Sequence, residues 1–333
     1  MYTYDLTGYA QDLRAWLADY RIGPPGAYAR HRRREGVDPS IADAYGCADA
    51  ANILYTLGAF PAGEGERAAW VEQLQSLQDP STGVFPNAVH SDFHTTAHCV
   101  AALELFDARP RHPLTFMDRL RGLQELGDFM ESRDWDHPWP ASHDLAGAAS
   151  ALIITGAADL TWLSLFIGWL DAEVDPATGM WRVGHILRPD VWPGLFGNLG
   201  GAFHYHFVYD YLRLPWPYPE RVIDTALMLL HDSAGSFIET DLGFKDADLV
   251  FCLSRARRQS DHRFDEVSAA LELLVDRAAA LLADGEYVSS TAFDDVHSAF
   301  GGLCAVAELQ RAVPGSIWTG TPLRLVLDRR PFI

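Results

Sequence analysis

The sequence predicts an all-α protein: a single α/α toroid over residues 1–333, with about six inner helices enclosed by about six outer helices. Three features support this prediction. A helix-ending turn recurs at a spacing of roughly fifty residues, which suits a helix pair plus a loop. Segments rich in alanine and leucine alternate with amphipathic segments, and no segment has the alternating pattern of a strand. Consecutive inner helices then run parallel, so that their N-termini open on one rim.

The recurring turn reads QDPSTGVF at residues 78–85 and VDPATGMW at residues 174–181, with a weaker copy, HDSAGSF, at residues 231–237. An Asp-Pro pair cannot continue a helix, and glycine supplies the positive φ that a tight turn needs. The aromatic residue that closes each copy can anchor the turn in the core. Each copy is therefore expected to end one helix and to lead, through a short polar loop, into an inner helix.

The inner helices are expected to be buried on both sides, because their sequences are apolar nearly all round. Each opens with a residue suited to capping, and their starts are expected near Asp43, Asp92, His143, Asn198, Asp246 and Asp294. The outer helices have one polar face and are expected at residues 5–20, 67–77, 114–131, 220–230 and 264–282. Residues 146–170 are apolar for long enough to span a bilayer, but Gly156 and Asp159 interrupt them. This interruption predicts a buried helical hairpin and no transmembrane segment.

Composition and charge exclude several classes of protein. The 45 acidic residues outnumber the 26 Lys and Arg residues, which gives a net charge of −19 and argues against a nucleic-acid partner. The four cysteines have no zinc or disulfide spacing, so reduced thiols are expected. The first residues are acidic and aromatic where a signal peptide needs a basic start, which predicts a cytoplasmic protein.

From about residue 43 to about residue 310, the chain resembles the terpenoid cyclase and protein prenyltransferase superfamily. The turns QDPSTGVF and EVDPATGMW, each followed by a capped, alanine-rich helix, are similar to the Gln-Asp-x-x-Gly-x-aromatic repeats of that superfamily. The resemblance implies an α/α toroid. It leaves the chemistry open, because related toroids also include polysaccharide lyases, glycoside hydrolases and sugar epimerases.

Cyclases of this superfamily protonate an alkene with an Asp-x-Asp-Asp motif at the start of an inner helix. The sequence DADL at residues 246–249 matches the first three positions, and the resemblance implies Asp248 as the proton donor. The magnesium motif DDxxD is absent, because residues 294–298 read DDVHS. The Asp-x-Cys zinc pair of the prenyltransferases is also absent, because residues 47–49 read CAD, in the reverse order.

The candidate site is the set of polar side chains in the first two turns of the inner helices, which one rim should bring together. The candidate catalytic residues are Asp248, Asp246, His204, His297 and Asp295. The candidate substrate-binding residues are Asp49, Tyr45, His94, His98, His143, Asp144, Phe203, Tyr205, His206 and Trp192. For the first residue of each helix, an ordinary capping role is the alternative explanation.

No metal and no cofactor are expected. His94 and His98 are four residues apart and so share one helix face, where a structural metal and a hydrogen-bonded pair are both open explanations. Two ligands fall short of the four that a closed zinc site needs. Residues 202–209 hold two histidines among four aromatic residues, which fits either a substrate surface or an aromatic core helix.

The function expected from these features is acid/base chemistry in the bore, as in a terpenoid cyclase or isomerase acting on an isoprenoid-like substrate. A carbohydrate-active lyase, hydrolase or epimerase is the first alternative, and a non-catalytic scaffold on the same fold is the second alternative. If the protein is an enzyme, the expected partner is a substrate that is either a small molecule or a glycan. An apolar blind bore would favour the isoprenoid, and an open groove with polar walls would favour the sugar.

Overall fold

The computed structural model describes residues 3–87, 89–185, 187, 194–232, 237–283, 285–290 and 293–333. Within these residues the regular secondary structure is almost entirely helical, with one parallel pair of two-residue strands, β1 (Tyr4–Asp5) and β2 (Ile317–Trp318). The all-α class predicted from the sequence is confirmed. No helix of the described residues is both long enough and apolar enough to cross a membrane.

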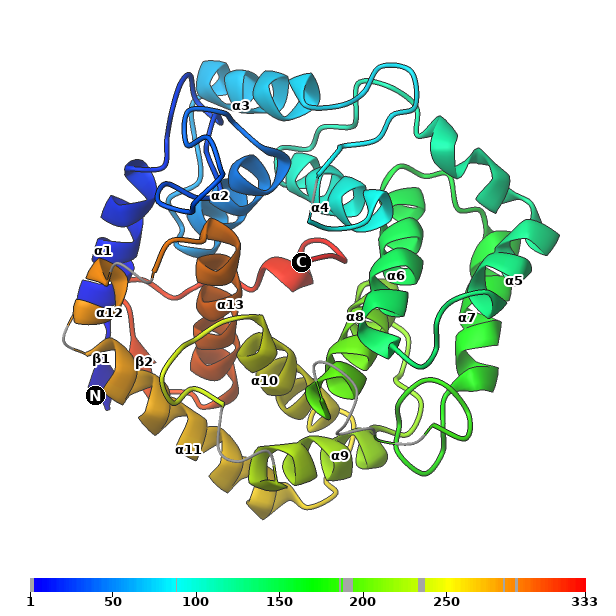
Figure 1. Ribbon diagram of the computed structural model, residues 1–333. Helices are drawn as coiled ribbons and strands as arrows, with labels where there is room; N and C mark the ends of the chain where they lie inside the picture. Colours follow the sequence, from blue (N-terminus) through cyan, green and yellow to red (C-terminus); the bar gives the residue numbers. More distant parts are fainter. Residues whose placement is uncertain are drawn as a thin grey trace.

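Six helices form a closed sequence of contacts around the centre of the molecule (Figure 1). They are α2 (Ala44–Thr56), α4 (Asp92–Leu105), α6 (Pro138–Ile154), α8 (Phe196–Leu212), α10 (Phe244–Ala256) and α13 (Val296–Ala312). Each packs on the next, and α13 packs back on α2. Nearly every residue of these helices is buried, as their uniformly apolar sequences predict.

The other helices lie at the periphery of Figure 1. They are α1 (Thr7–Ala18), α3 (Glu64–Ser76), α5 (Leu123–Glu131), α7 (Leu160–Glu173), α9 (Pro219–Asp232), α11 (Phe264–Leu282) and α12 (Glu286–Ser289), with a 3-10 helix, η1 (Thr115–Arg121), before α5. These helices are half-exposed. In α3, for example, only Trp70 and Leu74 are buried.

Some of the inner helices begin where the sequence predicted, and others do not. Asp43 caps α2 through a 2.9 Å hydrogen bond from the Gly46 amide, and Asp295 caps α13. The cap of α4 is Ser91 rather than Asp92. His143 and Asn198 were expected to open helices but lie inside α6 and α8, because Pro138 starts α6 and Phe196 starts α8.

The repeated turn has the same hydrogen bonds in both described copies. The Asp79 amide donates to the Val84 carbonyl at 2.8 Å, and the Gly83 amide donates to the Asp79 carbonyl at 2.9 Å. The copy at residues 174–181 repeats both bonds, from the amides of Asp175 and Gly179. The weaker copy at residues 231–237 lies mostly outside the described residues.

Gly83 tests how tightly this turn is packed. Its φ is +79°, and an added Cβ would overlap the Pro113 carbonyl oxygen. Gly36 has nearly the same φ, +78°, but open space around it. We expect Gly83→Ala to lower the free energy of unfolding by about 1–3 kcal/mol more than Gly36→Ala, because both carry the strain of positive φ and only the first carries the clash. Urea unfolding of the two variants measures the difference, and equal losses would contradict it.

The segment that follows β2 turns into the middle of the six-helix ring (Figure 1). It contains a 3-10 helix, η2 (Val326–Asp328), and the side chains of Arg330 and Phe332 beyond it are fully buried. The Pro331 carbonyl accepts a 2.5 Å hydrogen bond from Ser150 on α6, and Arg330 donates to Asn52 on α2. The interior of the ring is thus occupied by the protein's own chain.

Candidate functional site

A buried carboxylate joins two histidines from different helices. Asp49 on α2 accepts a 2.7 Å hydrogen bond from Nε2 of His98 on α4, and Nδ1 of His297 on α13 lies 3.1 Å from both Asp49 oxygens. Burial alone would raise the pKa of Asp49, but His297 and His98 outweigh it and hold that pKa below its usual value. The carboxylate is therefore ionised and fixes the orientation of both rings.

A second row of rings continues from this group. The hydroxyl of Tyr45 on α2 lies 2.5 Å from Nδ1 of His94, and the His94 ring is 4.5 Å from that of His143 on α6. His143 in turn lies 5.0 Å, between ring centroids, from His204 on α8. Burial lowers the pKa of His204 to about 4, so its imidazole is neutral at pH 7. Residues predicted from the separate helices α2, α4, α6, α8 and α13 are therefore in mutual contact.

Asp248 on α10 is buried without a compensating charge. Its side chain is 2% exposed, and its Oδ1 has no hydrogen-bond partner among the described residues. It lies against the same face of Gly200 as the rings of Trp139 and Phe196. Burial, reinforced by the charge of Asp246, raises its pKa well above the usual value. Burial therefore favours the neutral form of this carboxyl group.

The other two predicted acids have structural partners. Both oxygens of Asp246 accept 2.8 Å hydrogen bonds from backbone amides, those of Ile238 and Gly243. Asp295 forms a bidentate pair with Arg30 at 2.8 and 2.9 Å. Burial would raise the pKa of Asp295, but Arg30 outweighs it and keeps that pKa low. Asp246 holds the start of α10, and Asp295 is an ionised partner rather than a proton donor.

Three residues predicted to bind substrate lie on the outward faces of their helices. Asp144 pairs with Arg133 at 2.6 Å, Tyr205 packs on Trp181, and His206 stacks on Trp216 with 4.0 Å between ring centroids. The reason is geometric: residues two apart on a helix point about 200° apart, so His204 and His206 cannot both face the centre. Phe203 does face the interior, and Trp192 lies outside the described residues.

Two residues of the site were not predicted. His90 precedes the cap of α4, and its ring lies 4.9 Å from that of His94 and 5.6 Å from that of His297. Arg30, on the loop before α2, is 8% exposed, and its guanidinium lies 5.0 Å from the ring centroid of Tyr45. Sequence reasoning looked for site residues on the inner helices, and both of these residues are on loops.

A cavity of about 490 Å³ opens at the N-terminal ends of α10 and α13. Aromatic and acidic side chains line it, among them Trp139, Phe196, Phe244, Asp246 and Asp295. Two of its walls touch the histidines: Phe244 is 4.1 Å from His297 and Trp139 is 5.3 Å from His143, between ring centroids. The cavity therefore adjoins the histidine cluster.

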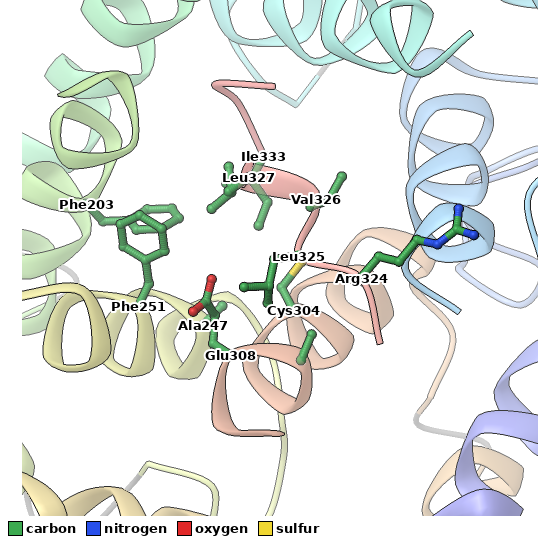
Figure 2. Close-up of a pocket in the computed structure, with 11 residues that line it drawn as sticks. Phe203, Ala247, Phe251, Cys304, Glu308, Arg324, Leu325, Val326, Leu327 and Ile333 are labelled. Carbon is green, nitrogen blue, oxygen red and sulfur yellow. The ribbon is translucent and has the colours of Figure 1, made fainter. Parts of the chain in front are cut away.

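A second cavity, which lies inside the ring, is far smaller. The cavity that Figure 2 shows there has a volume of about 10 Å³, which is room for roughly one water molecule. Phe203 and Phe251 face Leu327 and Ile333 across it. The ring of Phe332 lies 4.9 Å from that of His94 and 5.7 Å from that of Phe207, between ring centroids.

His206 provides a pH test that is separate from the site. Burial lowers its pKa to about 3. A histidine whose pKa is lower in the folded state stabilises the fold above pH 6.5 and loses that contribution as the pH falls towards 3. At pH 5 the protonation of His206 in the unfolded state lowers the free energy of unfolding by about 2 kcal/mol.

We therefore expect His206→Phe, which keeps the stacking on Trp216, to make the protein less sensitive to acid. Between pH 7.5 and pH 5.0 the variant should lose about 2 kcal/mol less free energy of unfolding than the wild type. Urea unfolding at the two pH values measures this. Identical pH dependence in both proteins would show that His206 protonates freely in the folded state.

No protein family matches the chain, and neither a curated protein nor a solved structure is detectably similar to it.

Proposed function

We propose that the six inner helices and their outer helices form an α/α toroid, and that its rim carries out acid/base chemistry on a neutral sugar. The observation that carries the proposal is the buried Asp49–His297 pair beside a cavity of about 490 Å³ with aromatic and carboxylate walls. Aromatic faces stack on sugar rings, and carboxylates accept hydrogen bonds from sugar hydroxyls.

His297 has the position of a general base. Its Nδ1 faces the Asp49 carboxylate, which holds the proton on that nitrogen and leaves Nε2 as the acceptor. Asp248 has the protonation state of a general acid, because its buried carboxyl stays neutral at pH 7. Two groups in opposite protonation states are what epimerisation or hydrolysis requires.

The charge of the cavity selects among sugars. Asp241, Asp246, Asp294 and Asp295 line it together with one cation, Lys245, which pairs with Asp241 at 3.3 Å. In a chain of net charge −19, this lining repels uronic acids and favours uncharged sugars. A lyase acts by β-elimination and depends on an electron-withdrawing carboxylate in its substrate, so an epimerase or a hydrolase fits better.

The isoprenoid cyclase is the second candidate, and Asp248 is the observation that favours it. A neutral carboxyl beside Trp139 and Phe196 suits protonation of an alkene followed by stabilisation of a carbocation. Against it stands the filled interior, where about 10 Å³ could not hold a polyprenyl chain. Because the larger cavity lies at the rim, we propose a sugar as the first candidate substrate and an isoprenoid as the second.

Incubation in D2O with a panel of neutral mono- and oligosaccharides, followed by NMR, tests the proposal. We expect one sugar to take up deuterium at carbon or to release a reducing end, and we expect Asp248→Asn and His297→Gln to abolish this. Polyprenyl diphosphates form the second arm. Turnover of these alone would replace the sugar by the isoprenoid, and no turnover in either arm would favour the non-catalytic scaffold.

A further inference from the structure

Three histidines at the rim form a group whose arrangement differs from that of the acid/base pair. They are His90 from the loop before α4, His94 from the first turn of α4, and His143 from α6. One ring nitrogen from each lies within 4.8 Å of the corresponding nitrogen of the other two. Nitrogens bound to one zinc ion are about 3.3 Å apart, given a zinc–nitrogen distance of about 2.0–2.1 Å and tetrahedral angles. Small side-chain rotations therefore suffice to close the group around an ion.

Hydrogen bonding within the described residues does not account for these rings. Nε2 of His90 is buried and has no partner there. His94 uses Nδ1 towards the Tyr45 hydroxyl, which leaves Nε2 free for another role. Buried ring nitrogens in native proteins normally have partners, so the unpartnered Nε2 of His90, beside ring nitrogens of His94 and His143, indicates a bound species.

Tyr45 provides the support that metal sites have around their ligands. Its hydroxyl holds His94 at 2.5 Å, and its ring packs on that of His90 with 4.7 Å between centroids. A group bound to the far nitrogen of a ligating histidine fixes its tautomer and orientation. Arg30 lies near Tyr45 and its charge acts on His90, but Arg30 is paired with Asp295.

A second group, Asp49, His98 and His297, also has ligand atoms within 4.8 Å of one another. Its members are already bonded together, with Asp49 accepting from His98 and His297 at 2.7 and 3.1 Å. An ion there would displace the hydrogen bonds of Asp49, whereas an ion between His90, His94 and His143 would give Nε2 of His90 a partner without displacing any of them.

We propose that His90, His94 and His143 bind one divalent transition-metal ion of the zinc class, with Tyr45 as the group that positions His94. Three imidazoles suit zinc, cobalt, nickel or copper, and they do not suit magnesium or calcium, which prefer oxygen ligands. Three protein ligands leave a fourth position open to water or to a substrate atom. This site goes beyond the proposed sugar chemistry and does not depend on it.

Metal binding by the full chain, without a histidine tag, tests the proposal directly. The protein is stripped with a chelator, dialysed, and titrated with Zn²⁺ and with Co²⁺. We expect one ion per chain by elemental analysis after gel filtration, the intense visible absorption of tetrahedral Co²⁺, and a higher melting temperature with Zn²⁺. No uptake at a tenfold excess of zinc would overturn the proposal.

Variants then identify the ligands. His90→Ala, in a half-buried loop position, and His143→Ala should each lower the zinc affinity at least 100-fold, and Tyr45→Phe should lower it about 10- to 100-fold. His262→Ala, on the loop between α10 and α11, is the matched control and should bind as the wild type does. Circular dichroism of the metal-free proteins shows which variants fold. If one of the two alanine variants does not fold, the other still tests the ligand assignment. Binding that survives both but is lost in His98→Gln would move the ion to the Asp49 group and contradict our assignment.

Discussion

Arg255→Met is expected to lower the free energy of unfolding by about 3–5 kcal/mol. The guanidinium and the Glu308 carboxylate are each 5% exposed, and Arg255 Nη2 lies 2.5 Å from Glu308 Oε1. Arg255 also reaches Asp210 at 3.3 Å and Asp328 at 2.7 Å, so that one side chain on α10 joins α8, α13 and η2. Its loss leaves the buried Glu308 with a 3.3 Å hydrogen bond from Ser254 and with Arg258 at 3.8 Å, and the cost of the poorly compensated charge dominates.

The double variant Arg255→Met with Glu308→Met should recover most of the loss, because it removes both charges together. The exposed pair Arg121–Asp118 serves as the control, and Arg121→Met should change the stability little. Urea unfolding of the four proteins completes the comparison. A double variant as unstable as Arg255→Met would mean that packing, not the buried charge, explains the effect.

Asp49→Asn is expected to lower kcat by about 10³- to 10⁴-fold while the protein stays folded. An asparagine can turn its amide group towards His297 and donate a hydrogen bond to Nδ1. The proton of the ring then moves to Nε2, which can no longer accept one from the substrate. The measurement is the single-turnover rate on the sugar that the NMR panel identifies.

Asp144→Asn is the matched control for this variant, because Asp144 is also an aspartate of an inner helix but pairs outward with Arg133. It should keep the rate of the wild type. Circular dichroism and the melting temperature verify that both variants fold. Equal rates for Asp49→Asn and Asp144→Asn would show that Asp49 has only a structural role. His297 would then not be the general base.

Local interactions explain the parts of the fold that could be predicted. The Asp-Pro turns end their helices as expected, because the amides of Asp79 and Gly83 bond to carbonyls of the same turn. The hairpin at residues 146–170 divides where Gly156 takes a φ of +73° and Asp159 caps α7 with a 2.8 Å bond from the Trp162 amide. Glycine conformation and side-chain caps act over a few residues and can be read directly.

The inward or outward direction of a side chain could be predicted only in part. On an amphipathic helix, the polar face marks the solvent side. On α8 nearly every residue is buried, so its sequence contains no such mark, and His204 and His206 were both assigned to the site. The direction of each side chain depends on the residues that it packs against. The ring of His204 contacts that of His143, and the ring of His206 stacks on that of Trp216.

The sequence alone was enough to predict the helical class, the alternation of buried and half-exposed helices, the repeated turns, and the gathering of Asp and His near helix starts. Only the tertiary structure brought His90 and Arg30 from loops into the site, divided the acids into the neutral Asp248 and the paired Asp295, and placed Phe332 inside the ring. The physical reason is that capping and turn formation depend on neighbours a few residues away, whereas burial, ion pairing and the pKa of a carboxyl depend on residues that are distant in the chain and adjacent only after it has folded.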